Sequence, residues 1–360
     1  MSMYEQRLAK DKDDIRRRVS DVGSRVSDAV QAAVDALLAR DEAACGRIIL
    51  GDLPINREVR EIDKLCHAFV ARHLPSAGHL RFVSSVLQMN VALERVGDYA
   101  ATIAREGVQL STAPPPDIAE EMRQLGKRAS ALLRRAVTAF TARDEELARA
   151  TKPQAKALDD IYARAFQDLA SEQRKAPVID LFAFLTVFHR LGRVSDQAKN
   201  ICEETLFELT GETKPPKRYR VLFVDARATL VAPLAVALAR KSFPESGSYE
   251  LAGFQAGDTL APELRKLGAD LALDLTGIAP ARLDISSESL RAYHVIVCLS
   301  REARRQFTRI PFDTVVLVWD LPSWSEGPSD ELDMRLKELS HHLSSEIHEL
   351  MVTMRGEGAS

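Results

Sequence analysis

Two pairs of oxygen-bearing side chains with the same spacing lie in the first third of the chain. Glu94 and Asp98 are four residues apart in a stretch of helical periodicity, and Asp52 and Asn56 repeat that spacing in the preceding helical stretch. Residues four apart project from one helix face, so each pair presents its oxygens together. Two antiparallel helices that contribute oxygen ligands can build a metal site in a bundle. The alternative is structural: Glu94 pairs with Arg95 or a facing Lys, and Asp98 caps a helix.

A second arrangement with chemical potential lies in the last third of the chain. The apolar run 221–224 is followed by a turn and by a helical stretch that begins near Ala232. A strand that leads through a loop into a helix presents backbone N–H groups to an anion. Asp225 follows the run directly, and a carboxylate at this point would repel a bound phosphate. Arg227 beside it indicates a local salt bridge.

Composition excludes several classes of protein. The 360 residues include 49 Lys and Arg against 52 Asp and Glu, so the basic excess expected of a nucleic-acid-binding protein is missing. The four Cys residues are far apart and form no C-x-x-C pair, which favours neither a disulfide framework nor a zinc ribbon. No apolar run is long enough to span a membrane, and the charged first residues do not fit a signal peptide. We expect a cytoplasmic protein.

The elements that must position these residues are helical before about residue 211 and mixed after it. Apolar residues from Leu8 to Leu37 recur at steps of mostly three or four, which predicts one long helix. Arg16 and the other charged residues between them are predicted to form its solvated face. Proline-rich segments at 111–116 and 211–218 predict breaks, because proline runs end helices and stiffen linkers.

The helical part contains an internal repeat. Residues 94–106 align with residues 192–204, and six of the thirteen positions match. We therefore predict a multi-domain α plus α/β protein, with two three-helix bundles at 1–111 and 117–210 and a linker at 211–218. Strand-like runs at 219–225, 249–254, 294–299 and 314–319 alternate with helices. They predict a small α/β domain with a four-stranded parallel sheet at 219–355, closed by a helix at about 329–354.

Residues 3–212 resemble the PhoU family, the negative regulators of bacterial phosphate uptake and signalling. The resemblance is carried by Gly51-Asp52, Glu61-Ile-Asp63, 74–77, Leu80-Arg81 and Glu94-Arg-Val-Gly-Asp98. It implies that the Glu-x-x-x-Asp motifs line sites for iron, zinc, magnesium or manganese. Carried over by position, the first repeat keeps Glu94, Asp98 and Asp52, with Asn56 in place of a frequent Asp.

The second repeat departs further from the family pattern. Gly192 stands where the motif Glu is expected and Ala155 where the first Asp of the facing pair is expected, which leaves Asp159 and Asp196 as possible ligands. In the first repeat, His79 occupies a position that is acidic in the family. One metal site is therefore expected rather than two.

The resemblance also implies a function and partners. PhoU-like bundles restrain a phosphate ABC transporter, through its ATPase, and a phosphate-sensing histidine kinase of a two-component system. Family members commonly form dimers, so we expect a homodimer that contacts the membrane only peripherally, through these partners. A plain metal-storage protein is the less favoured reading, because one partly degraded site supplies few ligands.

Residues 219–354 resemble the low-molecular-weight tyrosine phosphatase and arsenate reductase family in framework. Those enzymes need Cys-x₅-Arg, a thiolate nucleophile and an Arg that clamps the phosphate oxygens. Here the Cys position is Asp225, the Arg position is Val231, and the following Ser is Ala232, while Ser323 stands at the general-acid Asp. We predict a degenerate phosphate loop with no catalytic residues. The alternative is a phosphatase-like enzyme of altered mechanism acting on a phosphoprotein or an oxyanion.

Overall fold

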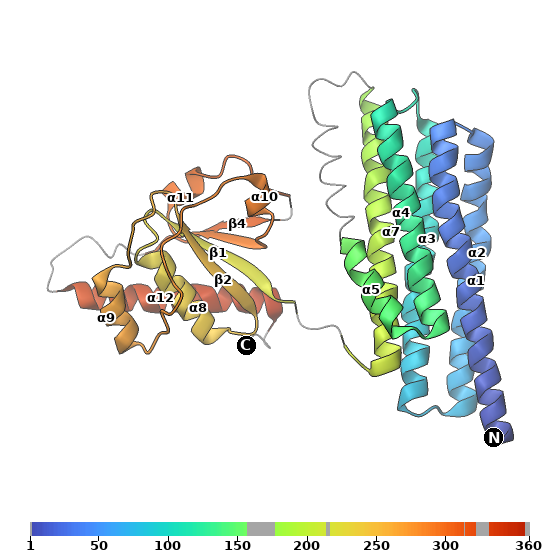
Figure 1. The fold of residues 1–360 in the computed structure, drawn as a ribbon, viewed down its shortest axis with the longest axis horizontal. Coiled ribbons are helices and arrows are strands. Elements are labelled where there is room, and N and C mark those ends of the chain that lie inside the picture. Colours follow the sequence, from blue (N-terminus) through green and yellow to red (C-terminus); the bar gives the residue numbers. More distant parts are fainter. Residues whose placement is uncertain (1, 157–176, 214–216, 313, 322–330, 357–360) are drawn as a thin grey trace. The chain divides into compact units, whose positions relative to one another are not determined.

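The computed structural model describes residues 2–156, 177–213, 217–312, 314–321 and 331–356. The chain divides into two compact units, Met1–Lys214 and Pro215–Ser360, and each is described by itself. The expected class is confirmed: the first unit is helical and the second is an α/β domain with a four-stranded parallel sheet (Figure 1).

The first unit contains six described helices that lie alongside one another (Figure 1). They are α1 (Met3–Ala39), α2 (Glu42–His73), α3 (Ala77–Gln109), α4 (Pro116–Ala142), α5 (Glu145–Lys156) and α7 (Val178–Thr210). Polar side chains define several helix starts, because they accept N–H groups that have no partner within the helix. Ser2 and Glu5 form a capping box on α1, and Asp41 accepts the N–H of Ala44 at the start of α2.

One hydrophobic core runs through both repeats. The apolar stripe of α1, from Ile15 to Leu37, is buried in it together with side chains from α2, α3, α4 and α7. Phe82 of α3 and Phe140 of α4 are stacked with ring centroids 6.2 Å apart, so aromatic contact joins the first repeat to the second. The proline-rich segment at 111–116 therefore connects two halves of one core.

The sheet of the second unit has the order β2-β1-β3-β4, and all its strands are parallel. The strands are β1 (Tyr219–Asp225), β2 (Gly247–Gly253), β3 (Val295–Cys298) and β4 (Val315–Val318). The helices are α8 (Val231–Ser242), α9 (Pro262–Asp270), α10 (Ser287–Leu290), α11 (Arg301–Arg305) and α12 (Leu332–Arg355).

Alternate residues of the central strands enter two different cores, as the two-residue period of a strand requires. Val221 and Phe223 pack with residues of α8, α9 and α12, whereas Leu222 and Val224 pack with residues of α10 and α11. Helices thus cover both faces of the sheet (Figure 1). In such open sheets, ligands bind beyond the carboxyl ends of the strands where the strand order reverses. Asp225 ends β1 at that reversal, between β2 and β3.

In the described part of the chain, none of the helices combines the length and the apolarity needed to cross a lipid bilayer.

Candidate functional site

The acidic site of the first repeat is built around a glycine. A Cβ atom placed on Gly97 of α3 would lie 2.7 Å from Oδ1 of Asp52 on α2, so the carboxylate lies directly against the α3 backbone. Asp52 is 9% exposed, and its Oδ2 accepts a hydrogen bond of 2.8 Å from Nδ2 of Asn56. The two residues that share this face of α2 are therefore hydrogen-bonded to each other.

Two oxygen atoms of this site lack hydrogen-bond partners. Oδ1 of Asp52 and Oδ1 of Asn56 are both buried, and neither accepts a hydrogen bond. A buried acceptor without a partner costs free energy, on the order of 1–3 kcal/mol. A cation bound between these atoms would remove that cost.

The charge around Asp52 is also unbalanced. Burial raises the pKa of Asp52, the nearby negative charge of Asp98 raises it further, and Asn56 and Arg105 lower it. Asp98 is exposed and Glu94, one turn earlier on α3, is half-buried. The structure thus joins Asp52 to Asn56 by a hydrogen bond and places Asp98 near enough for its charge to act on Asp52, with Glu94 one turn earlier on α3.

The donor atoms of these residues suit a divalent metal ion, but the number of ligands is small. Their donors are hard oxygen atoms, which suit magnesium, manganese or ferrous iron better than zinc. Among the described residues, no group of three or more His, Cys, Asp or Glu side chains is placed to hold a metal ion. The residues that would hold a cation here are Asp52 and Asn56, with Asp98 nearby.

The second repeat does not reproduce this arrangement. Asp196 is paired with Arg193 at 2.7 Å, one turn apart on α7. Ala155 is buried and apolar, and Asp159 lies outside the described residues. Gly192 faces open space, with no atom within 4 Å of an added Cβ. The contacts of Asp196 are those of a structural ion pair.

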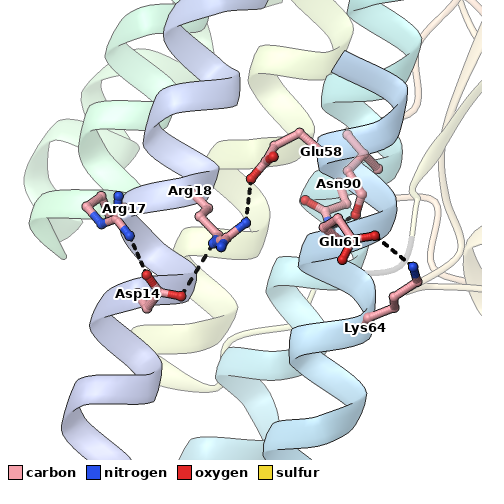
Figure 2. A network of polar contacts seen from close by, with 8 residues as sticks. Asp14, Arg17, Arg18, Glu58, Glu61, Lys64 and Asn90 are labelled. Atoms are coloured by element: carbon pink, nitrogen blue, oxygen red, sulfur yellow. Dashed lines mark hydrogen bonds and ion pairs between the residues drawn. The ribbon is translucent and has the colours of Figure 1, made fainter. Parts of the chain in front are cut away.

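Other acidic residues of the first repeat form ion pairs and hydrogen bonds within and between helices. Figure 2 shows the polar network in which Arg18 of α1 joins Asp14 to Glu58 of α2, while Glu61 pairs with Lys64. Asp63 accepts a hydrogen bond of 2.7 Å from Nδ2 of Asn90, a residue of α3 that is labelled in the same view. These carboxylates have protein partners and are separate from the Asp52 site.

The loop after β1 is closed around the side chain of Asp225. Oδ2 of Asp225 accepts the N–H of Ala232 at 2.8 Å, in the first turn of α8, and Oδ1 accepts the N–H of Ala228. The sequence suggested a salt bridge with Arg227, and this was wrong: backbone amides bind the carboxylate. Burial raises the pKa of Asp225, although hydrogen bonds from the amides of Ala232, Ala228 and Arg227 lower it.

The loop is held rigidly in this conformation. Its carbonyl groups at Ala226, Arg227 and Thr229 accept backbone N–H groups of the segment 255–261 at 2.8–2.9 Å. Gly253 is needed beneath the loop, because an added Cβ would lie 2.9 Å from three loop backbone atoms. Val231 is half-buried against the core at the start of α8, and Ala232 is fully buried. The carboxylate of Asp225 therefore occupies the position at which the loop amides would otherwise bind an anion.

Asp320 follows β4, and its side chain is exposed. It pairs with Arg301 at 3.5 Å on the surface, and Ser323 lies outside the described residues.

Two buried acidic residues were missed by the sequence reasoning. Asp180, in the first turn of α7, accepts four hydrogen bonds from the N–H groups and hydroxyls of Ser111 and Thr112. Glu208 of α7 pairs with Arg16 of α1 at 2.5 Å, with side chains 2% and 12% exposed. The prediction that Arg16 belongs to a solvated face was therefore wrong. Arg16 and Glu208 are 192 residues apart in the sequence, so no local pattern predicts that they pair.

Comparison with known proteins agrees with the fold of the first unit. The PhoU domain model matches residues 19–107 and 122–205, one segment in each repeat. A PhoU homolog of Xylella fastidiosa (strain Temecula1), described as a phosphate-specific transport system accessory protein, is 30% identical over 226 residues. That match covers 60% of this chain and 92% of the relative. A homolog of the same description from Pseudomonas putida is 27% identical over 230 residues, or 63% of this chain and 90% of the relative.

Solved structures give the same result. PhoU from Pseudomonas aeruginosa superposes with a TM-score of 0.55 at 28% identity, over 57% of this chain and 100% of that one. The phosphate transport system regulatory protein PhoU from Streptococcus pneumoniae gives 0.53 at 26% identity, over 59% and 99%. The first unit is thus a tandem-repeat helical domain of the PhoU type. The chain belongs to the PhoU family, with an α/β domain following the two repeats.

Proposed function

We propose that this protein is a regulatory accessory protein that restrains phosphate uptake and phosphate-starvation signalling. Its targets would be the ATPase of a phosphate ABC transporter and a phosphate-sensing histidine kinase. The observation that carries the proposal is coverage of both repeats by the PhoU domain, together with relatives named as phosphate transport accessory proteins. The protein would act as a homodimeric adaptor in the cytoplasm.

The Asp52 site would support this role by binding a divalent cation. The unpartnered oxygens of Asp52 and Asn56, with Asp98 on the facing helix, are its expected ligands. A cation there would join α2 to α3 and remove the repulsion between Asp52 and Asp98. The acids of the second repeat, Asp196 and Asp159, would form a weaker metal site, because Asp196 already pairs with Arg193.

We further propose that the second unit is a pseudoenzyme descended from a low-molecular-weight phosphatase or arsenate reductase. Its sheet order, its loop between β1 and α8 and its amides directed at one point support a phosphate-loop framework. Asp225 fills that point with a carboxylate, and Val231 offers no guanidinium to hold phosphoryl oxygens. The domain would then serve interaction or dimerisation rather than catalysis.

The adaptor role is tested by affinity capture. The full chain and a chain that ends at residue 212 are used as baits in phosphate-replete and phosphate-starved cells. Recovery of the transporter ATPase or the kinase with both baits is the expected result. Recovery of neither partner under either condition contradicts the proposal.

The metal site is tested by elemental analysis of the purified full chain. Glu94→Ala with Asp98→Ala is expected to lower bound divalent metal, as is Asp52→Ala alone. The matched control is Asp196→Ala, which removes the corresponding acid of the second repeat from its ion pair with Arg193. Metal content that is unchanged in the first-repeat variants, or equally lowered in the control, contradicts the assignment.

A further inference from the structure

A cluster of cations lies at the end of the helical unit where α3 begins and α4 and α7 end. It consists of Lys12 and Arg16 of α1, His79 of α3 and Arg143 at the end of α4, and we call it the Lys12 cluster. Nζ of Lys12 is 3.4 Å from Nδ1 of His79, so a cation has an imidazole rather than a carboxylate as its nearest partner. Arg143 is close enough to influence the titration of both Lys12 and His79.

The positive charge of this cluster is only partly balanced. Glu208 neutralises Arg16, to which it is bound at 2.5 Å. Within the described ranges, neither Lys12 nor Arg143 forms an ion pair with a carboxylate, and Asp13 acts on Lys12 only at longer range. Burial lowers the pKa of Lys12, and the charges of Arg16 and Arg143 add to this effect, while Glu208 and Asp13 oppose it. The cluster thus has a net positive charge in a partly desolvated place.

Two of the cations, Lys12 and Arg16, are also held by contact with an aromatic ring. The ammonium of Lys12 lies 4.7 Å from the ring centroid of Phe82, and the guanidinium of Arg16 lies at the same distance from that ring. Phe82 is fully buried and stacked on Phe140, so the aromatic floor is part of the core. Side chains fixed by such contacts lose little further entropy when they bind a ligand.

The start of α3 adds to the positive field. Its N-cap residue, Ser76, makes no side-chain hydrogen bond to the helix, and His79 is in the first turn. The N-terminus of a helix carries a partial positive charge and N–H groups without partners inside the helix.

We propose that the Lys12 cluster is a binding site for a small tetrahedral oxyanion of the phosphate type. Lys12 and Arg143 would supply the charge, and His79 would donate a hydrogen bond to the ligand. The site lies apart from the Asp52 site, which is on the middle parts of α2 and α3. The proposal goes beyond the adaptor role, because it concerns direct ligand binding by the helical unit.

The test is equilibrium dialysis of the full chain with radiolabelled inorganic phosphate at constant ionic strength and pH 7. Saturable binding to one site per chain is expected for the unchanged protein. Lys12→Gln removes a cation, and His79→Asp places a carboxylate beside it. Each change is expected to weaken binding by about tenfold or more, because the first removes a charge-assisted hydrogen bond to the ligand and the second adds a like charge beside it.

Lys10→Gln is the matched control, because Lys10 is an exposed residue two positions away on the same helix. Its phosphate binding should equal that of the unchanged protein, and circular dichroism melting without phosphate confirms that each variant is folded. Competition by sulfate supports a site for free oxyanions, and competition by phosphoserine supports one that also accepts a phosphoryl group. Absence of saturable binding, or binding by Lys12→Gln and His79→Asp that equals binding by the unchanged protein, overturns the proposal while leaving the adaptor role intact.

Discussion

Asp180 of α7 binds Ser111 twice, accepting its backbone N–H at 2.9 Å and its hydroxyl at 2.8 Å. Asp180 is fully buried, and Thr112 donates two further hydrogen bonds to the same carboxylate. The residues that follow α3 are therefore anchored to the first turn of the last helix of the unit. Arg40 also donates hydrogen bonds to the carbonyl oxygens of Leu110 and Ser111, so two side chains hold the start of the segment between the repeats.

We expect Asp180→Ala to lower the free energy of unfolding of the helical unit by about 2–4 kcal/mol, because four donors lose a charged acceptor. Urea denaturation followed by circular dichroism measures this loss. Asp28→Ala is a suitable control, since its carboxylate pairs with Arg134 on the surface. Equal stability of the two variants would contradict the assigned role of Asp180.

The same carboxylate predicts a dependence on pH. Burial raises the pKa of Asp180, but the hydrogen bonds from Thr112 and Ser111 outweigh it and leave the pKa below its ordinary value. The ionised form is therefore favoured by folding, and its stabilisation is complete above the unfolded pKa of about 3.9. It is lost as the pH falls through the folded pKa. Between about pH 5 and pH 2, Asp180→Asn should lose less stability than the unchanged protein in urea titrations.

The pair of Arg16 and Glu208 gives a second test of stability. Glu208→Gln leaves the buried guanidinium of Arg16 without its counter-charge, so a loss of about 3–5 kcal/mol is expected. Combining it with Arg16→Met removes the uncompensated charge and should recover part of that loss. A double variant that is less stable by the sum of the two single losses would show that the two side chains are not coupled.

Two glycines of the motif helices are predicted to respond oppositely to alanine. Gly192 faces open space, so Gly192→Ala should raise the free energy of unfolding by about 0.5–1 kcal/mol through helix propensity. Gly97→Ala offers the same gain, but its Cβ would lie 2.7 Å from Oδ1 of Asp52. That carboxylate must move, so we expect no net gain and a lower metal content. Denaturation and elemental analysis measure both effects, and equal stabilisation by the two changes would disprove the close contact.

The loop of the second unit is tested by Asp225→Cys combined with Val231→Arg. This pair restores a thiol and a guanidinium at the loop whose amides now bind Asp225. We expect weak hydrolysis of an aryl phosphate by the variant and none by the unchanged chain. Turnover by the unchanged protein would contradict the proposal of a pseudoenzyme, and turnover that survives Asp225→Ala would show that a contaminant or another site is responsible.

The sequence by itself determined the elements and their order. Apolar steps of three and four in residues 8–37 predicted α1, and the strand-like runs at 219–225 and 294–299 predicted β1 and β3 to within about one residue. These signals are local, because a helix or a strand repeats its buried face within a few residues. The spacing of Glu94 and Asp98, and of Asp52 and Asn56, likewise placed each pair on one helix face.

The tertiary structure decided which charges find partners. The sequence pattern predicts that Arg16 lies on the surface, but α7 brings Glu208, 192 residues away in sequence, to its side. The sequence predicts that Asp225 pairs with Arg227, but the fold of its loop turns two backbone amides toward its carboxylate instead. Asp52 lies against Gly97 because that position of α3 has no side chain. Such contacts depend on how distant helices and loops pack, and periodicity within one element carries no information about its neighbours.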